Sequence, residues 1–236
     1  MSTFAKCNTD CRSCQSIALS VFCTLKPQEL EELNLHKVSL EVSKGSVVFY
    51  ENNMPTGLYC VHEGAVKVYN TSLNGDIQIN RLAKNSDIIG YRSLLANEPY
   101  KGTAETIKDS TICFIPKSSL YALIGTNIEF SLKMMEAMAK ELNRAEQKSL
   151  DILFKSTRER LAEAILLLHQ TFGLDVRGYI NVKLTRGEFA AITGMVHETV
   201  VRILAEWEKE GILQLDKKLI KITNLTELLN IAKLED

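Results

Sequence analysis

His197 and Glu198 are the pair of side chains most suggestive of catalysis, and they lie in the stretch TGMVHETVVRILAEWEKEGI, residues 193–212. Zinc hydrolases place such a pair on a helix and add a second His four residues after the first, so that both imidazoles bind one metal ion. Here that position holds Val201. Glu198 then has no metal-bound water to activate, which argues against a metalloprotease. The alternative for this helix, which also carries Arg202, is a place in a DNA groove.

The six cysteines form a second group of side chains that could do chemistry. The segment MSTFAKCNTDCRSC is polar where a signal peptide would have its apolar core, so we expect a cytoplasmic protein. In a reducing compartment, clustered cysteines favour metal or redox chemistry over disulfide bonds. Cysteines within apolar runs are more often ordinary buried thiols. The clustered ones are Cys7, Cys11, Cys14 and Cys23, and those in apolar runs are Cys60 and Cys113.

Length and composition limit the possible classes of protein. The chain has 236 residues, of which 45% are hydrophobic and 24% charged, as in a soluble protein with one large domain or two small ones. No apolar run in the sequence is long enough to span a bilayer, so we expect no membrane partner. The net charge is −1, which means that any DNA binding must come from a local basic patch.

The first half of the chain is predicted to be a β domain. A short amphipathic helix begins near Pro27, where proline suits the first turn. From Val38 to Pro116, short runs rich in β-branched and aromatic residues alternate with turn residues, as in an antiparallel barrel or jelly roll. Asn74 and Gly75 lie between two of these runs and indicate a hairpin, because both residues tolerate positive φ.

A long helix is predicted to follow the β domain. From Asn127 onward, apolar residues step by alternating threes and fours, which is the spacing of a coiled-coil seam. A second apolar set on this helix suggests that one face packs inward while the other meets a partner, so we predict a homodimer. The alternative is that the seam packs on the chain's own β domain. The seam consists of Ile128, Met135, Met138, Leu142, Ala145, Ser149 and Ile152, and the second set of Phe130, Leu132, Met134 and Leu153.

The last third of the chain is predicted to contain a helix-turn-helix. A capping box at residues 156–159 begins a new helix, so a domain boundary is expected near Lys155. A second capping pattern begins at Thr185 and is followed by the short helix EFAAIT. Gly194 then makes the turn, and the next helix ends before Gly211.

The second helix of this motif would present its first turns to the major groove. Arginine is the commonest bidentate donor to guanine, and glutamate accepts from the cytosine amino group. An exposed ion pair between Glu198 and Arg202 is the alternative role for those two residues. The following segment, ILQLDKKLIKITN, is expected to form a two-stranded wing with cations at its tip. The candidate DNA contacts are His197, Glu198, Val201 and Arg202 on the helix, and Lys217 and Lys218 on the wing.

The motifs LTRGEFAAITGMVHETVVRIL, GLYCVHEGAVKVY and DIIGYRSLL resemble those of the CRP/FNR family of bacterial transcription regulators. The resemblance covers nearly the whole chain. It implies an α+β fold with an N-terminal cyclic-nucleotide-binding-like β-roll (a jelly roll), a long dimerisation helix and a C-terminal winged helix-turn-helix. The implied partners are palindromic double-stranded DNA, a second copy of the chain and, for an activator, RNA polymerase. By resemblance, Glu198 and Arg202 read bases, while Arg186 and Thr199 lie near phosphates.

The resemblance also implies a division into four segments. These are a cysteine-containing segment at residues 1–25, a β-roll sensor domain at 26–126, a dimerisation helix at 127–155 and a DNA-binding domain at 156–236.

Two sets of residues indicate which signal the β-roll would sense, and the first is the set that binds cyclic AMP in relatives. Relatives that bind cyclic AMP carry a Glu for the ribose and an Arg-Ser pair for the cyclic phosphate, where this chain has Tyr91 and the pair Lys101-Gly102. Because lysine replaces arginine poorly where bidentate geometry is needed, we do not expect cyclic AMP to bind. The candidate effector pocket consists of Gly90, Tyr91, Arg92, Lys101, Gly102 and Thr103.

The oxygen-sensing branch of the family holds a [4Fe-4S] cluster with three cysteines near the N-terminus and one in the β-roll. Cys11 and Cys14 match the first two ligands, and Cys113 matches the β-roll ligand. The position of the third ligand holds Ser20, and Cys23 lies three residues further on. A cluster needs four thiolates in space rather than one fixed spacing. The resemblance therefore implies Cys11, Cys14, Cys23 and Cys113 as ligands, with zinc or no metal as alternatives.

Two classes of function follow from these observations. The favoured one is a homodimeric, sequence-specific DNA-binding transcription regulator whose β-roll responds to an effector or to redox change. The alternative is a small-molecule-binding or enzymatic β-roll protein whose helical domain serves only assembly. We predict no catalytic residues, because His36, His62 and His169 lack any nucleophile or ligand spacing around them. Salt-dependent binding to palindromic DNA would distinguish the two classes.

Overall fold

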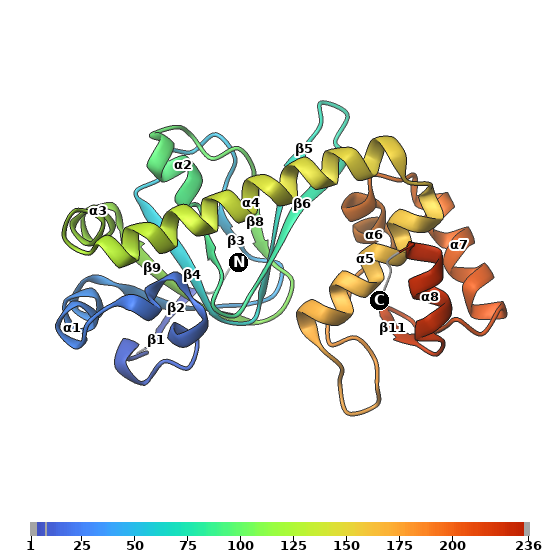
Figure 1. Cartoon of the computed structure of the whole chain (residues 1–236), viewed down its shortest axis with the longest axis horizontal. Helices are drawn as coiled ribbons and strands as arrows, with labels where there is room; N and C mark the ends of the chain where they lie inside the picture. The colour runs from blue at the N-terminus through green and yellow to red at the C-terminus, as the bar shows by residue number, and fades with distance from the viewer. Residues whose placement is uncertain (1–3, 8, 234–236) are drawn as a thin grey trace. The chain divides into compact units, whose positions relative to one another are not determined.

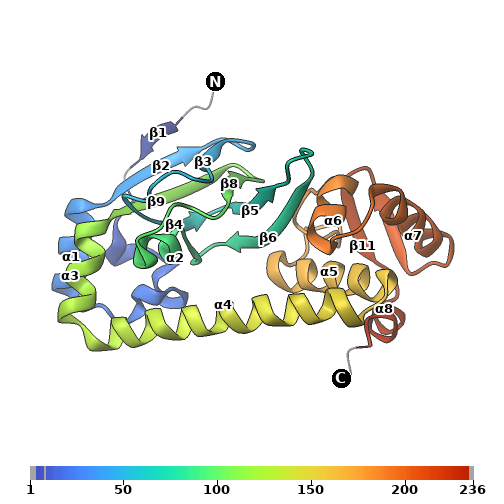
Figure 2. The ribbon, with the colours of Figure 1, turned by 90° about the horizontal axis from the view of Figure 1, so that it is seen from above.

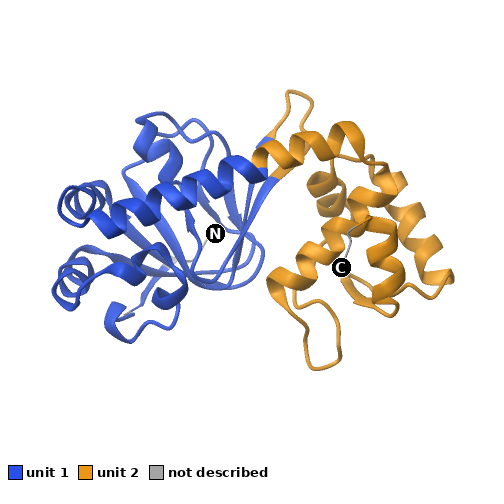
Figure 3. Cartoon of the chain, viewed as in Figure 1, with its two compact units in different colours: residues 1–70, 80–144 blue, residues 71–79, 145–236 orange. Residues whose placement is uncertain are grey.

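The computed structural model describes residues 4–7 and 9–233 (Figure 1). Residues 1–3 and 8 of the predicted N-terminal segment, and residues 234–236, lie outside the described part. The chain divides into two compact units, one formed by residues 1–70 and 80–144 and the other by residues 71–79 and 145–236 (Figure 3). Among the described residues, no helix is long and apolar enough to cross a bilayer.

Two antiparallel sheets form the β domain, which confirms the predicted β-roll. Their strand orders are β1-β2-β9-β4-β7 and β3-β8-β5-β6. Buried Val61, Val66 and Ile112 belong to the core of the domain, as expected where short strands turn one face inward. The strands are β1 (Phe4–Cys7), β2 (Val38–Val42), β3 (Val47–Phe49), β4 (Gly57–Glu63), β5 (Ala65–Thr71), β6 (Ile77–Lys84), β7 (Ile88–Ile89), β8 (Thr103–Thr106) and β9 (Ser110–Pro116).

The predicted hairpin joins β5 to β6. The amide of Gly75 donates to the carbonyl of Ser72 at 3.0 Å, and the amide of Ser72 donates to the carbonyl of Asp76 at 2.8 Å. Gly75 has a φ of +87°, whereas Asn74 is not among the positive-φ residues. The glycine therefore provides the left-handed conformation by itself, in a loop longer than the two-residue turn that Asn-Gly pairs favour.

Short helices and turns cover the β-roll. The helix predicted near Pro27 is present, while the single 3-10 turns and two further helices were not predicted. Phe22 of the last turn stacks on Phe130, with 5.5 Å between ring centroids. These elements are η1 (Cys11–Ser13), η2 (Ile17–Leu19), η3 (Val21–Thr24), α1 (Pro27–His36), α2 (Tyr91–Ala96) and α3 (Lys117–Thr126).

The long helix α4 spans Ile128–Phe154. Asn127 begins it, since its side chain accepts a hydrogen bond from the amide of Phe130 at 2.9 Å. Figure 2 shows the first part of α4 running alongside the strands of the first unit. Phe130 and Met134 are buried there, as expected for the inward face, whereas Leu132 and Leu153 are exposed. All seven residues of the predicted seam are exposed.

The second unit contains the predicted helix-turn-helix and wing. Its first helix begins after Ser156, whose side chain accepts from the amide of Glu159 at 3.3 Å. The break between α4 and this helix lies at Lys155, while the division into compact units falls at residues 144 and 145, inside α4. The four predicted segments therefore remain a proposal. The elements are α5 (Thr157–Phe172), α6 (Arg186–Thr193), α7 (His197–Lys209), β10 (Leu213–Asp216), β11 (Leu219–Ile222) and α8 (Leu225–Ala232).

Candidate functional site

The turn between α6 and α7 fixes the candidate DNA-binding helix. Thr185 caps α6 by accepting from the amide of Glu188 at 3.1 Å, and the Glu188 carboxylate accepts from the amide of Thr185 at 2.8 Å. Gly194 follows α6 with a φ of +65°, a left-handed conformation that glycine adopts without steric cost. The predicted capping pattern and turn are both confirmed.

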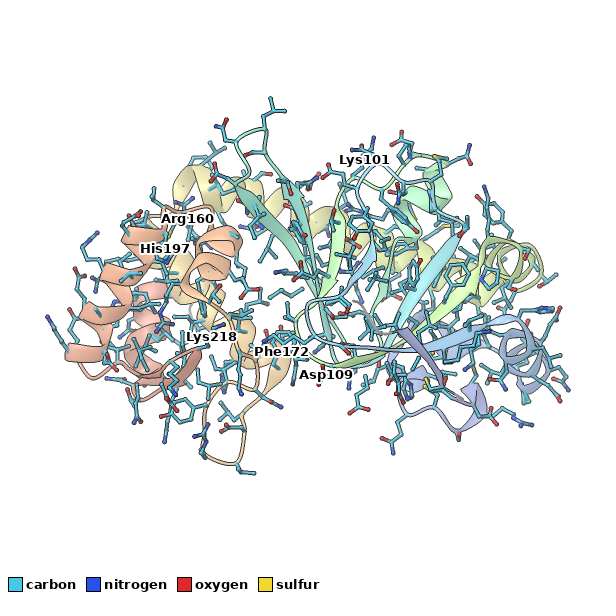
Figure 4. All side chains as sticks on the ribbon, turned by 180° about the vertical axis from the view of Figure 1, so that it is seen from behind. Lys101, Asp109, Arg160, Phe172, His197 and Lys218 are labelled. Carbon is cyan, nitrogen blue, oxygen red and sulfur yellow. The ribbon has the colours of Figure 1, made fainter. Side chains whose placement is uncertain are left out.

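The helix α7 has one buried face and one exposed face. Val200, Ile203, Leu204 and Trp207 are buried, at most 1% exposed, and their spacing places them on a single stripe. The opposite face carries the four predicted base-contacting residues, and Figure 4 labels His197 at the start of the helix. These residues are His197, Glu198, Val201 and Arg202, all of them exposed.

Arg202 makes a different ion pair from the one considered in the sequence. Its guanidinium donates to Glu206 at 2.9 Å, not to Glu198, and 64% of its side chain is exposed. Glu206 also accepts from Arg158 at 2.8 Å. An exposed pair of this kind contributes little to stability, so Arg202 can exchange Glu206 for a ligand at low cost.

Arg186 and Thr199 lie at the starts of α6 and α7 and are half-buried. One terminal nitrogen of Arg186, Nη1, is buried and has no hydrogen-bond partner within the part of the chain that the structure describes. Burial lowers the pKa of this guanidinium, yet arginine stays protonated in proteins.

The wing is a tight antiparallel hairpin. Asp216 pairs with Leu219, which leaves Lys217 and Lys218 in the turn. Lys217 has a φ of +54°, and both lysines are exposed. Figure 4 labels Lys218 at this tip. The predicted wing with two cations at its end is confirmed as a structure.

The residues of the predicted effector pocket fall into two groups. Tyr91 is buried and donates to Glu141 of α4 at 2.5 Å, and Arg92 pairs with the same carboxylate at 3.3 Å. Burial and this hydrogen bond raise the pKa of Tyr91. Arg81 also donates to Glu141, at 2.9 Å. Both predicted side chains thus bind the long helix instead of lining a cavity for a ligand.

The second group lies at the start of β8, where Lys101 and Gly102 precede Thr103. Lys101 is exposed and pairs with Glu98 at 3.1 Å, and Figure 4 labels it at the edge of the β-roll. Thr103 is buried, and its hydroxyl accepts from the amide of Glu51 at 3.1 Å. A Cβ on Gly102 would lie 2.9 Å from the Tyr69 carbonyl, so the backbones approach closely there.

Aromatic side chains occupy the interior beside Gly90. Phe49 and Tyr100 stack with their ring centroids 3.9 Å apart, and Tyr59 lies 5.7 Å from Phe49. A Cβ on Gly90 would come within 3.1 Å of the Tyr100 ring. The space next to this predicted pocket residue is therefore filled by the protein itself.

The second candidate site is a cavity between the N-terminal turns and the larger sheet. Its volume is about 30 Å³, which holds one or two water molecules. Cys11, Cys14 and Cys113 line it, as the predicted ligand set requires, but Cys23 does not and is exposed. The lining also includes Cys60, which was interpreted from the sequence as a buried strand cysteine, and Ser16, Ile17, Ser20, Phe22, Leu33, Lys37, His62 and Ile115.

The thiols of this cavity influence one another. Burial raises the pKa of Cys11 to about 11, and it raises the pKa of Cys60 further. The thiolates of Cys113 and Cys14 add to both shifts by repulsion, while Lys37 opposes the shift of Cys11. Cys14 lies 3.1 Å from the Nδ1 atom of His62. Cys60 is the lining cysteine that was not predicted as a ligand, because its pairing with Cys113 joins two strands that are distant in the chain.

The four thiols of the cavity are donors of the type that an iron-sulfur cluster uses. Among the described residues, no group of three His, Cys, Asp or Glu side chains is close enough to hold one metal ion. A single zinc needs all its sulfur ligands about 2.3 Å from one point, whereas each thiolate of a cluster binds its own iron. Four thiols around one cavity match the second requirement.

Two family models match the chain. The model of the cyclic nucleotide-binding domain matches residues 39–127, and that of the Crp-like helix-turn-helix domain matches residues 159–231. The fumarate and nitrate reduction regulatory protein of Escherichia coli K12 is 28% identical over 230 residues, covering 96% of this chain and 91% of the relative. The anaerobic regulatory protein of Aggregatibacter actinomycetemcomitans is 27% identical over 230 residues, covering 96% and 89%.

Solved structures share the fold. FixK2 from Bradyrhizobium japonicum superposes with a TM-score of 0.75 at 26% identity, covering 85% of this chain and 99% of that protein. A CRP/FNR-family transcriptional regulator from Thermus thermophilus gives a TM-score of 0.72 at 22% identity, covering 84% and 100%. The latter likeness concerns the fold alone.

Proposed function

This chain belongs to the CRP/FNR family of transcription regulators, and from that premise we propose that it binds palindromic operators as a homodimer. The family consists of DNA-binding regulators and not of enzymes. The chain is accordingly a transcription regulator with a cyclic-nucleotide-binding-like domain and a helix-turn-helix. Its place of action is the cytoplasm, where the DNA partner lies, and an activator of this type would also contact RNA polymerase.

The observation that carries the proposal is the exposed face of α7. Four side chains with base-reading chemistry lie on it, and the packing of the opposite face on the core fixes their direction. Arg186 at the start of α6 is half-buried, and its guanidinium is proposed to lie near a DNA phosphate, as the family resemblance implies. The lysines at the tip of the wing add positive charge to a chain whose net charge is −1.

Homodimerisation is inferred from the exposed seam of α4. Seven residues spaced as in a coiled coil are left uncovered along a helix of 27 residues. A two-fold dimer reads two half-sites about one helical turn of DNA apart, so the operator should be a palindrome.

The test is selection of bound duplexes from a pool with a randomised segment, using the purified full chain under anaerobic conditions. We expect enrichment of a two-fold symmetric site whose affinity falls steeply with salt. If the recovered duplexes show no enriched sequence at any salt concentration, the chain does not bind DNA sequence-specifically.

The signal proposed for the β-roll is redox change sensed through an iron-sulfur cluster. Two of the relatives are named for anaerobic regulation, and cysteines line a cavity of the β-roll. When bound, such a group supplies oxygen-sensitive redox chemistry. Cyclic AMP is not proposed, because Tyr91 and Arg92 engage Glu141 and aromatic rings fill the space beside Gly90.

A further inference from the structure

Strand pairing brings two distant cysteines onto one rung of the larger sheet. Cys60 of β4 pairs directly with Cys113 of β9, and Cys113 pairs on its other side with Ser39 of β2. Directly paired residues of neighbouring strands point to the same face of a sheet. Both thiols therefore face the N-terminal turns, and both line the cavity there.

The N-terminal turns bring two more thiols to the same cavity. Cys11 and Cys14 lie at the two ends of η1, where the amide of Cys14 donates to the carbonyl of Cys11 at 3.3 Å. The amide of Cys11 also donates to Asn34 at 3.2 Å, and the hydroxyl of Ser16 donates to the carbonyl of His62 at 2.7 Å. The bond to His62 ties the turns to β4 of the sheet, and the bond to Asn34 ties them to α1.

Cys23 is separated from this group. It lies in η3, is exposed and does not line the cavity. Ser20, which precedes η3, does line it, and its hydroxyl is buried between the carbonyl of Ile17 and the amide of Phe22. An N-terminal position that lines the cavity, and that matches the family's third ligand, is thus occupied by a serine.

The cavity holds one cation beside its four thiols. Lys37 lines it and donates to Thr9 and, at 3.2 Å, to the hydroxyl of Ser39. An ammonium group beside thiolates offsets part of the cost of burying negative charge. The cavity of about 30 Å³ is smaller than a cluster, so binding one requires the single 3-10 turns to move outward. Short 3-10 turns are suited to such movement, since their hydrogen bonds are few and poorly aligned.

We propose that Cys60 is the fourth cluster ligand of this chain, together with Cys11, Cys14 and Cys113, and that Cys23 is not a ligand. This proposal rests on the cluster named in the proposed function. It places two ligands on the N-terminal turns and two on neighbouring strands of the β-roll. The missing third N-terminal cysteine is thereby replaced by a cysteine of β4.

The test measures iron, sulfide and visible absorbance in full-length protein reconstituted anaerobically. The variants are Cys60→Ala and Cys60→Ser, with Cys23→Ala and Cys7→Ala as matched controls. Cys7 lies on the same rung, paired with Ser39, but does not line the cavity. We expect both Cys60 variants to lose the iron and the absorbance, and both controls to retain them at the level of the unmodified chain.

A rescue variant keeps the test decisive if loss of Cys60 also disturbs folding. Ser20→Cys in the Cys60→Ser background returns a fourth thiol to the cavity, so iron and absorbance should reappear. Thermal melting of each variant checks that it is folded. Retention of iron by the Cys60 variants, or its loss from Cys23→Ala, would overturn the ligand assignment while leaving the cluster in place. If the unmodified chain takes up no iron, both the ligand assignment and the proposed cluster are wrong. The proposed DNA-binding function would not be affected by that result.

Discussion

Arg202 carries the base-reading chemistry that can be tested most directly at the scale of one residue. Its guanidinium is exposed and pairs with Glu206, and an exposed pair is weak, so Arg202 is available to donate to guanine O6 and N7. Arg202→Ala should weaken operator binding by about 1–3 kcal/mol per half-site and relax the preference at one base pair. Selection on randomised duplexes measures both effects. An unchanged selected half-site would mean that Arg202 does not read a base.

Lys217 should behave differently, because it lies at the tip of the wing and not on the helix. It is proposed to bind a phosphate, which carries no sequence information. Lys217→Ala should weaken binding equally for all sequences. The slope of log affinity against log salt concentration should decrease by about one unit for each phosphate that is no longer neutralised. Affinity titrations over a range of salt concentrations measure this slope. A changed base preference in this variant would reverse the roles assigned to helix and wing.

The cysteines show which part of a site can be predicted from sequence. Cys11 and Cys14 were predicted as ligands from the resemblance to the oxygen-sensing branch, whose first two ligands have the same local spacing, and both residues line the cavity. Cys60 was not, because its position opposite Cys113 depends on the register of two strands far apart in the chain. The exposure of Cys23 likewise depends on how the N-terminal turns pack, for which periodicity gives no signal.

At the scale of elements, local signals were sufficient for the helix-turn-helix, the β-roll strands and the long helix, and they were insufficient for the packing between elements. Capping patterns at Ser156 and Thr185 correctly marked the starts of α5 and α6, because a cap involves neighbouring residues only. The helix α8 was missed, although Asn224 caps it by accepting from the amide of Glu227 at 3.0 Å. The arrangement of Tyr91 and Arg92 around Glu141 could not be predicted, since it needs the docking of α4 on the β-roll.

The seam of α4 gives a prediction about assembly. Met138→Glu with Leu142→Glu should yield monomers, because the new carboxylates would be buried against their symmetry copies. The matched control is Asn143→Glu with Gln147→Glu, which adds the same charge at the same spacing on exposed positions outside the seam. Analytical ultracentrifugation should find the control dimeric. A seam variant that remains dimeric would show that another surface forms the dimer.

At the scale of the whole molecule, the cavity and the DNA-binding helix should be coupled. Loss of the proposed cluster in air would change the packing of the N-terminal turns on the β-roll, and a coupling of typical size alters affinity by about 5-fold or more. We therefore expect the DNA affinity of the anaerobic protein to change on exposure to air. Cys60→Ala, titrated in the same way, should have one affinity under both conditions. If the unmodified chain binds DNA with the same affinity before and after exposure to air, the cavity is not coupled to DNA binding.

The most direct test of the whole account is the ratio of two dissociation constants, measured on one preparation at one salt concentration. The selected palindrome is compared with a scrambled duplex of the same length and composition. A regulator that reads bases through the exposed face of α7 should bind the palindrome about 1,000-fold more tightly or better. A ratio near one would contradict sequence-specific recognition, and with it the role assigned here to this chain.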